Sequence, residues 1–368
     1  MIFETDLSTI KGVIRKLTAF SEDVNVRIGL REKDIVFEVF NRKSASAIEI
    51  KLSGASITED VVDSAVIPYR NLRNAIESIN KNNEVVTVAV QSDKVFVKSG
   101  SSSVAILPVN DDLGAVQRID PVCTFEVAPA IFSKVLADCV PYTSDENSHY
   151  ALQGVKIDEI DGELCAVATN GRCLNVEPLQ ATYEELSLPN DVILPTRFCQ
   201  IFRALANDVI QDAKVLISNE AFAVEWDGLY VRVQRVEGRY PNWKKMFPKE
   251  SDCKVIEFDR EEIANAIQSA SHVNDNKFKT VRFVFDGEKV TLKTNTEQCM
   301  WEERVELFDG EIEGEVAFDV SYLRWFCSAN GDKLVWFISD LKKAAYMKIG
   351  ESRFLIMPIE LLKAEEKE

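Results

Sequence analysis

Apolar residues recur at helical spacing in three separate segments of the chain. In the first segment they stand at Ile10, Val13, Ile14 and Leu17, a spacing that lines one face of an α-helix. The same spacing returns at two later places, at Phe132, Val135, Leu136 and Cys139 and at Ile263, Ala266, Ile267 and Ala270. The pattern predicts amphipathic helices over 6–19, 128–140 and 259–273, each directly after a short strand.

A second apolar element follows each of these helices. Residues 66–70 read VIPYR and residues 193–197 read ILPTR, with a weaker copy, AFDVS, at 317–321. In each copy a short apolar strand runs into a Pro or an Asp, which are residues favoured at helix starts. Further helices are therefore predicted over 69–81, 195–208 and 320–332.

Between the helices, apolar and polar residues alternate at the period of a β-strand. The alternating ranges are 24–28, 86–90, 95–97, 229–233, 281–285 and 289–292. Asp-Gly pairs at 161–162, 227–228 and 286–287 are typical of tight hairpin turns. Each third of the chain thus combines two helices with a hairpin-rich antiparallel sheet, which is the α+β class.

The recurrence divides the chain into three similar parts. The repeated strand–helix starts at Phe3, Phe125 and Ile256 are spaced a whole domain apart. Polar or proline-containing stretches at 118–122 and 250–254 separate the parts. We therefore predict three tandem domains, at 1–120, 121–251 and 252–368.

The charge and the cysteine spacing argue against several classes of protein. The 60 acidic and 43 basic residues give a formal net charge of -17, which argues against a uniformly basic nucleic-acid binder. The eight cysteines are scattered without a C-x-x-C pair, so neither a zinc ribbon nor a disulfide scaffold is expected. With two histidines and no nucleophile elbow, phosphate-binding loop or dinucleotide fingerprint, the sequence predicts no catalytic site, metal or cofactor.

The N-terminal segment lacks the features of a targeting sequence. Glu4 and Asp6 stand where a signal peptide would be apolar, and no apolar run approaches the length of a membrane span. We therefore expect a soluble, cytoplasmic protein without a membrane partner.

Three local sequences point to one family. Residues 237–248, EGRYPNWKKMFP, are similar to the pattern E-G-R-[FY]-P-x-[YW]-x-x-x-x-P. Residues 168–174, ATNGRCL, are similar to A-T-D-G-H-R-L, and residues 354–361, FLIMPIEL, to a terminal M-P-[MIV]-R-L. In this order, within a triplicated chain of this length, they resemble the bacterial β sliding clamp, the β subunit of DNA polymerase III. The chain departs from the family at Arg172 and Cys173, which replace His-Arg, and at Glu360, which replaces a frequent Arg.

The resemblance implies a non-catalytic processivity factor. Two protomers would close head to tail into a ring of six similar domains, with helices lining the hole and sheets outside. Double-stranded DNA would pass through the hole irrespective of its sequence. The ring would tether the replicative DNA polymerase and other DNA-processing proteins, and a separate ATP-dependent clamp loader would open it.

The resemblance also assigns three sets of site residues. A groove for short linear motifs of partner proteins would be formed by Leu152, Thr169, Gly171, Arg172, Leu174, Pro241, Lys245, Met246, Leu355, Met357, Pro358, Ile359 and Glu360. The cations expected to face DNA are Arg15, Lys16, Arg70, Arg73, Lys81, Arg197 and Arg203. The dimer contact would join Val104 of one protomer to His272 and Val273 of the partner subunit.

Other interpretations stay open at the level of sequence. The six predicted helices sum to a formal charge of +3 in a chain of net charge -17, but ordinary solvation of a polar helix face would also account for Lys11, Arg15 and Lys16. The groove set could equally form the core of a domain joint. Two alternative functions are an enzyme on a repeated α+β fold and a clamp-like peptide-binding hub that does not encircle DNA. Native mass in solution separates a dimeric ring from a monomeric hub.

Overall fold

The computed structural model describes residues 1–21, 23–59, 64–80, 84–111, 113, 115–146, 149–206, 211–273 and 279–360. Its contacts divide the chain into two compact units. The first unit combines Met1–Ser133 with Gln180–Val236, and the second combines Lys134–Leu179 with Glu237–Glu368.

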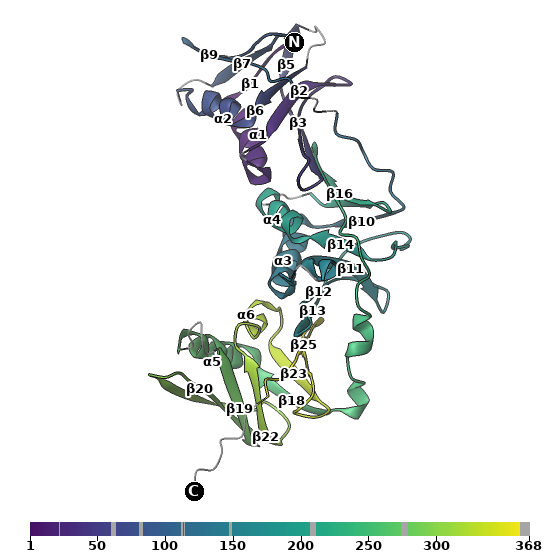
Figure 1. Cartoon of the computed structure of the whole chain (residues 1–368), viewed down its shortest axis with the longest axis vertical. Helices are drawn as coiled ribbons and strands as arrows, with labels where there is room; N and C mark the ends of the chain where they lie inside the picture. The colour runs from purple at the N-terminus through teal and green to yellow at the C-terminus, as the bar shows by residue number, and fades with distance from the viewer. Residues whose placement is uncertain are drawn as a thin grey trace. The chain divides into compact units, whose positions relative to one another are not determined.

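The first unit is built on two antiparallel sheets (Figure 1). The smaller sheet has the order β5 (Ser56–Glu59), β1 (Ile2–Asp6), β7 (Val85–Val90), β8 (Val95–Ser99) and β9 (Ser102–Ile106). The larger sheet has the order β10 (Cys123–Val127), β15 (Ala213–Ile217), β16 (Ala221–Trp226), β17 (Leu229–Gln234), β4 (Ser46–Lys51), β3 (Asp34–Asn41), β2 (Asn25–Arg31) and β6 (Ala65–Pro68). The short strand β14 (Val192–Pro195) also belongs to this unit.

Three helices pack together in the first unit because each is apolar on one face only. They are α1 (Leu7–Phe20), α2 (Tyr69–Glu77) and α4 (Thr196–Leu205), and α1 contacts both others. A fourth helix, α3 (Pro129–Cys139), begins in this unit and ends in the second. Aromatic rings fill the core between α3, α4 and the larger sheet, with the Phe132 and Phe202 centroids 5.0 Å apart and those of Phe198 and Phe222 5.3 Å apart.

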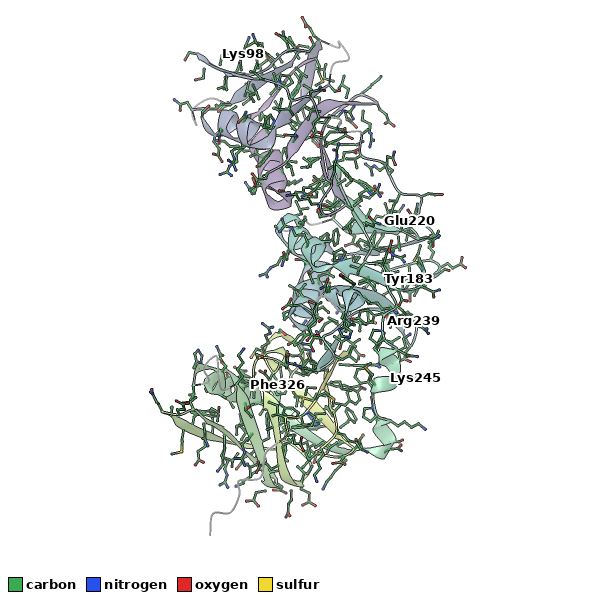
Figure 2. The ribbon with its side chains drawn as sticks, viewed as in Figure 1. Lys98, Tyr183, Glu220, Arg239, Lys245 and Phe326 are labelled. Atoms are coloured by element: carbon green, nitrogen blue, oxygen red, sulfur yellow. The ribbon has the colours of Figure 1, made fainter. Side chains whose placement is uncertain are left out.

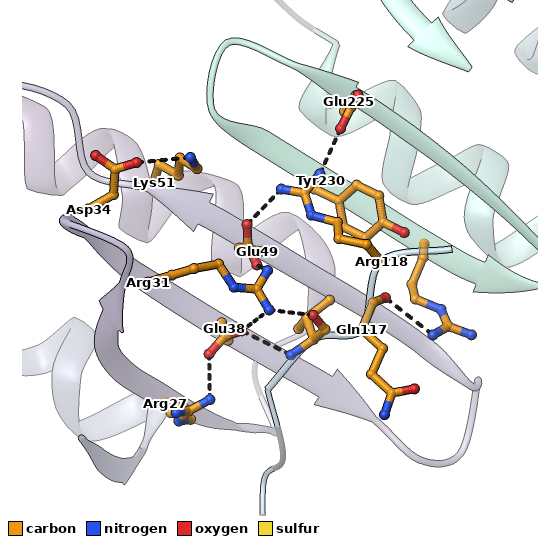
Figure 3. A network of polar contacts seen from close by, with 12 residues as sticks. Arg27, Arg31, Asp34, Glu38, Glu49, Lys51, Gln117, Arg118, Glu225 and Tyr230 are labelled. Atoms are coloured by element: carbon orange, nitrogen blue, oxygen red, sulfur yellow. Dashed lines mark hydrogen bonds and ion pairs between the residues drawn. The ribbon is translucent and has the colours of Figure 1, made fainter. Parts of the chain in front are cut away.

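An ionic network around a buried carboxylate braces the pairing of β4 with β17 (Figure 3). The carboxylate of Glu49 on β4 is fully buried and is paired with both Arg31 and Arg118, the latter at 2.8 Å. The Arg118 guanidinium lies 4.0 Å from the centre of the Tyr230 ring on β17. The segment that carries Arg118 is therefore held across the sheet by charges that would be costly to bury alone.

The second unit also contains two antiparallel sheets. The larger runs β11 (Gly154–Ile160), β12 (Glu163–Thr169), β13 (Cys173–Pro178), β25 (Ser352–Ile356), β24 (Ala345–Ile349), β23 (Lys333–Ile338) and β18 (Lys254–Asp259). The smaller runs β21 (Met300–Glu306), β20 (Lys289–Asn295), β19 (Thr280–Gly287) and β22 (Ile312–Asp319). Helices α5 (Arg260–Val273) and α6 (Trp325–Ser328) contact each other, and four 3₁₀ turns are η1 (Val140–Tyr142), η2 (Tyr150–Gln153), η3 (Trp243–Met246) and η4 (Glu250–Asp252).

The predicted α+β class with antiparallel sheets is confirmed. Sheet continuity explains why contacts divide the chain into two units although the sequence repeats three times. The β4–β17 pair joins strands on either side of the predicted boundary near residue 120, and the β13–β25 pair does the same for the boundary near residue 251. The domain limits 1–120, 121–251 and 252–368 stay a prediction.

The helices over 6–19, 128–140 and 259–273 are observed within one residue at each end, as α1, α3 and α5. The prediction of a helix over 320–332 was wrong, because only Trp325–Ser328 is α-helical. Residues 320–324 form turns in which Tyr322 N donates to Asp319 O at 3.1 Å and Leu323 N to Val320 O at 3.1 Å. These bonds join residues three apart and close tighter turns than those of an α-helix.

Two of the three predicted hairpin turns have the expected backbone. Asp161 and Gly162 have φ of 55° and 86°, and Asp227 and Gly228 have φ of 42° and 71°, as a type I′ turn requires. In the third hairpin Asp286 pairs with Lys289, so the loop is one residue later than predicted. Among the described residues no helix is both long and apolar enough to cross a membrane.

Candidate functional site

The pairing of β13 with β25 brings two of the three family-like segments together. Leu174 lies opposite Leu355, and Cys173 lies opposite Ile356. The ladder continues past the end of β25, where Met357 N donates to Arg172 O at 2.8 Å. Leu174 and Leu355 are buried, so they form a floor rather than an exposed surface.

The loop before β13 is held by its own side chains. Asn170 Oδ1 accepts hydrogen bonds from Arg172 N at 2.9 Å and from Cys173 N at 3.1 Å. Thr169 Oγ1 donates to Cys173 O at 2.6 Å and accepts from Gly171 N at 3.1 Å. Gly171 has φ of 84°, which costs little only for glycine. The turn keeps Thr169 buried and leaves Arg172 exposed.

Cys173 is part of this turn but is not a reactive thiol. Its burial raises the pKa of the thiol to about 12, although the positive charge of Arg324 and hydrogen bonds at Asn170 act in the opposite direction. The side chain therefore stays neutral and acts as a small buried residue.

The third family-like segment lies across the same sheet from α6. Tyr240 is buried and donates its hydroxyl to Val167 O on β12 at 3.3 Å. Pro241 is half-buried, and Lys245 and Met246 are exposed on η3, with Met246 at 45%. Figure 2 shows Lys245 and Phe326 of α6 on opposite sides of the sheet.

The chain leaves β25 as an exposed, partly apolar segment. Met357 is 50% exposed and Ile359 38%, whereas Pro358 is half-buried and Glu360 is exposed. Ile359 N donates to Ala317 O at 2.7 Å, which fixes the backbone on β22. Leu152, on η2, is half-buried.

All thirteen predicted groove residues thus belong to the second unit, and those on β13, β25 and the segment after β25 adjoin in one ladder. Exposed Met246, Met357 and Ile359 offer flexible apolar contacts, which suit a surface that accepts short peptides. The residues that anchor the segments, Asn170, Tyr240 and Trp243, were not among the predicted site residues. An Asn-Gly pair in a loop and aromatics in a polar stretch were the available signals.

The predicted DNA-facing cations lie on three helices of the first unit. Arg15 and Arg203 are exposed, on α1 and α4, and Lys16 is half-buried. Arg70 pairs with Asp23 at 3.0 Å and Arg73 with Glu77 at 2.9 Å, both on or beside α2. Lys81 lies outside the described residues.

Arg197 has a different role from the other predicted cations. Its Nη2 donates to Phe20 O at 3.2 Å. Phe20 is the last residue of α1, so the guanidinium satisfies a carbonyl that has no partner within its own helix. Arg197 therefore links α4 to the end of α1.

The residues predicted at the dimer contact lie beside sheet edges. Val104 is half-buried on β9, the outermost strand of its sheet. His272 and Val273 are the last two residues of α5, and α5 contacts β21, an outermost strand of the sheet β21-β20-β19-β22. Both edges present backbone groups able to pair with another strand.

No group of three or more His, Cys, Asp or Glu side chains among the described residues is arranged to hold a metal ion.

Residues 126–242 match the family described as DNA polymerase III beta subunit, central domain. A β sliding clamp of Rickettsia bellii is 20% identical, with 96% of each chain covered, and one of Salmonella typhimurium is 25% identical over 70% of each chain. The DNA polymerase III subunit beta of Pseudomonas aeruginosa has the same fold, with a TM-score of 0.84, 17% identity, and coverage of 98% of this chain and 100% of that chain. Over nearly its whole length the chain is therefore similar to β sliding clamps in sequence and in fold. The three segments anchored on β12, β13 and β25 are therefore those by which the sequence resembled β sliding clamps.

Proposed function

We propose that this protein is a β sliding clamp, which forms a homodimeric ring around double-stranded DNA and tethers the replicative DNA polymerase. The protein itself catalyses no reaction and acts in the cytoplasm. Its three domains would be 1–120, 121–251 and 252–368. The observation that carries the proposal is the β13–β25 ladder, in which the buried pair Leu174 and Leu355 is followed by the exposed Met357.

The ladder supports binding of short linear motifs from the polymerase, the clamp loader and other DNA-processing proteins. Met357 and Ile359 present apolar surface beside a hydrogen-bonded backbone, and Arg172 and Glu360 supply opposite charges at its margin. Two apolar side chains of a partner, each contributing about 1.5–3 kcal/mol on burial, support micromolar affinity after the cost of association.

The cations of α1, α2 and α4 support contact with DNA. Arg15, Arg70 and Arg203 are exposed on helices of one unit, and exposed guanidinium groups bind phosphates without regard to base sequence. The protein has a net charge of -17, so attraction to DNA would be local to this helical surface.

Ring closure is supported by the edge strands β9 and β21. In the part of the chain that the structure describes, each ends its sheet, and a head-to-tail dimer would pair the edge of one protomer with the other edge of the partner subunit.

The test combines native mass with topology. Sedimentation should give twice the protomer mass, and protein loaded on a nicked circular duplex should remain bound until the circle is linearised. A Val104→Lys variant, which places a charge on the β9 edge, should become monomeric and lose retention on the circle. A monomer that still binds polymerase peptides would instead identify a hub that does not encircle DNA.

A further inference from the structure

A partly buried carboxylate on β11 holds the segment that carries two of the predicted groove residues. Asp158 is 19% exposed, and its Oδ2 accepts a hydrogen bond from the indole Nε1 of Trp243 at 2.8 Å. The same oxygen lies 3.0 Å from Lys156 Nζ. Its Oδ1 accepts from Glu159 N at 2.9 Å and lies 3.6 Å from Lys244 Nζ.

Trp243 is the first residue of η3 and is only 1% exposed. Its ring meets Phe247 edge to face, with centroids 6.2 Å apart, and Phe247 in turn meets Tyr346 at 4.8 Å. Tyr240, before η3, is attached to Val167. Tyr240 and Phe247 thus hold the chain before and after η3. Among the described residues, η3 itself is hydrogen-bonded to the sheet by the side chain of Trp243, which donates to Asp158.

The hydrogen bonds inside η3 are too few to fix this four-residue turn in place. Inside the turn, Lys245 N donates to Asn242 O at 3.3 Å and Trp243 N donates to Pro241 O at 2.8 Å. A single 3₁₀ turn has poor hydrogen-bond geometry and does not persist without external contacts. The position of Lys245 and Met246, two and three residues after Trp243, therefore depends on what holds the indole.

We propose that Asp158 is a positioning residue of the partner groove, which acts by holding the Trp243 indole so that Met246 and Lys245 are preset for a partner peptide. The inference rests on the proposed groove function. It adds a residue that neither touches the peptide nor belongs to the three family-like segments.

The charge of Asp158 is part of this role. Burial raises the pKa of its carboxyl, but hydrogen bonds from Trp243, Glu159 N and Lys156 more than offset this, so the pKa lies below its ordinary value. The group is an anion at neutral pH, accepts hydrogen bonds from the indole and from Lys156, and attracts Lys244 at 3.6 Å. Asparagine at this position keeps an oxygen for the indole and loses the attraction to Lys156 and Lys244, so it should preserve most of the positioning.

If Asp158 holds η3 ready for a partner peptide, loss of its bond to Trp243 should weaken peptide binding. The probe is a fluorescent peptide from the partner-binding segment of the replicative polymerase, titrated against the full-length protein. Asp158→Ala and Trp243→Phe should each weaken binding roughly tenfold, because each removes the same hydrogen bond to a charged acceptor. The double variant should bind no more weakly than the weaker single variant. Asp158→Asn should restore most of the affinity, and Arg282→Ala, which breaks the exposed pair with Glu315 on another sheet, should bind as the wild type does.

Trp243→Phe keeps the ring packed on Phe247, so it tests the bond even where Asp158→Ala lowers expression. Met246→Glu tests the groove itself and should abolish binding. Tight binding by Asp158→Ala and Trp243→Phe, or additive losses in the double variant, would overturn the positioning role while the groove stands. Unchanged binding by Met246→Glu would overturn the groove, and the positioning role with it.

Discussion

Leu174 on β13 lies directly opposite Leu355 on β25, and both side chains are buried. Register in an antiparallel pair decides which side chains lie together on one face, and a shift of β25 by one residue would turn Leu355 to the other face of the sheet from Leu174. The exposed Met357 follows this pair by two residues. The floor and the exposed margin of the proposed groove are therefore set by one ladder.

A truncation can separate the groove margin from the sheet. Ending the chain at Ile356 keeps the whole of β25 and removes Met357 and Ile359. Removal of these two partly exposed apolar side chains should weaken binding of a polymerase peptide by at least about tenfold. Thermal unfolding and dimer mass should not change, and calorimetry measures the peptide affinity.

Ending the chain before Leu355 should have a different result. Leu355 pairs with Leu174 on one side and with Tyr346 on the other, so β25 is an interior strand. Its loss should lower the unfolding temperature as well as peptide affinity. Equal peptide binding by the chain ending at Ile356 and the full chain would contradict the proposed groove margin.

The predicted DNA cations should differ in their effect on stability. Arg197→Ala removes the hydrogen bond to Phe20 O and should lower the free energy of unfolding by about 1 kcal/mol. Arg203→Ala, on the same helix, is the matched control because Arg203 is exposed, and it should leave stability unchanged. Urea unfolding measures both, and equal stability of the two variants would rule out the link between α4 and α1.

Charge removal from the helices should change the salt dependence of DNA binding. Replacing Arg15 and Arg203 by Ala should make the plot of log affinity against log salt less steep, by about 0.9 for each phosphate that the protein no longer neutralises. Lys214→Ala, exposed on β15 of the same unit, should leave the slope unchanged. Fluorescence anisotropy with duplexes of two unrelated sequences measures this slope, and a change confined to one sequence would argue against backbone contacts.

Local periodicity predicted most of this fold. The i, i+3, i+4, i+7 stripes marked α1, α3 and α5, and the strand–proline starts marked α2 and α4, because those signals act within one helix. The helix predicted over 320–332 was too long, because the backbone of Tyr322 and Leu323 makes turn bonds and only Trp325–Ser328 is α-helical. The joining of β4 to β17 and of β13 to β25 could not be predicted, since partner choice depends on strands far apart in sequence.

The sequence identified the segments that carry the proposed groove residues, but not the residues that hold those segments in place. Resemblance identified the residues from Thr169 to Leu174 and from Leu355 to Glu360, but a periodic pattern does not say which polar residue in a strand is buried. Asp158, Glu49 and Glu177 look like ordinary solvent-facing positions in sequence. Their contacts depend on partners on distant segments, such as Trp243 for Asp158.

The two arginines that hold Glu49 should be strongly coupled. Replacing Arg31 or Arg118 alone leaves the other paired with the buried carboxylate. Removing both leaves Glu49 without an opposite charge, which should cost about 3–5 kcal/mol, more than the sum of the single changes. Denaturant unfolding of the four proteins measures the coupling, and additive losses would show that the shared carboxylate does not dominate the network of Figure 3.

Glu177 should make the stability of the second unit depend on pH. Its carboxylate is buried and accepts hydrogen bonds from Trp325 Nε1 at 3.0 Å and from Ser352 Oγ. Burial raises the pKa of Glu177 above its ordinary value of 4.5, against the opposing effect of these two hydrogen bonds. Between pH 4.5 and this raised pKa, Glu177 is therefore protonated more often in the folded protein than in the unfolded chain.

Stability should fall as the pH rises from 4.5 through the raised pKa of Glu177, because in that window the folded state binds more protons than the unfolded state. Above the window the full cost of burying the charge remains. Glu177→Gln cannot ionise, so its stability relative to the wild type should increase across the same window, whereas Glu163→Gln, exposed on β12, should follow the wild type. Thermal unfolding at a series of pH values compares the three proteins. A difference between Glu177→Gln and the wild type that is constant with pH would mean that Glu177 has the same pKa in the folded and unfolded states, and that the hydrogen bonds from Trp325 and Ser352 fully offset its burial.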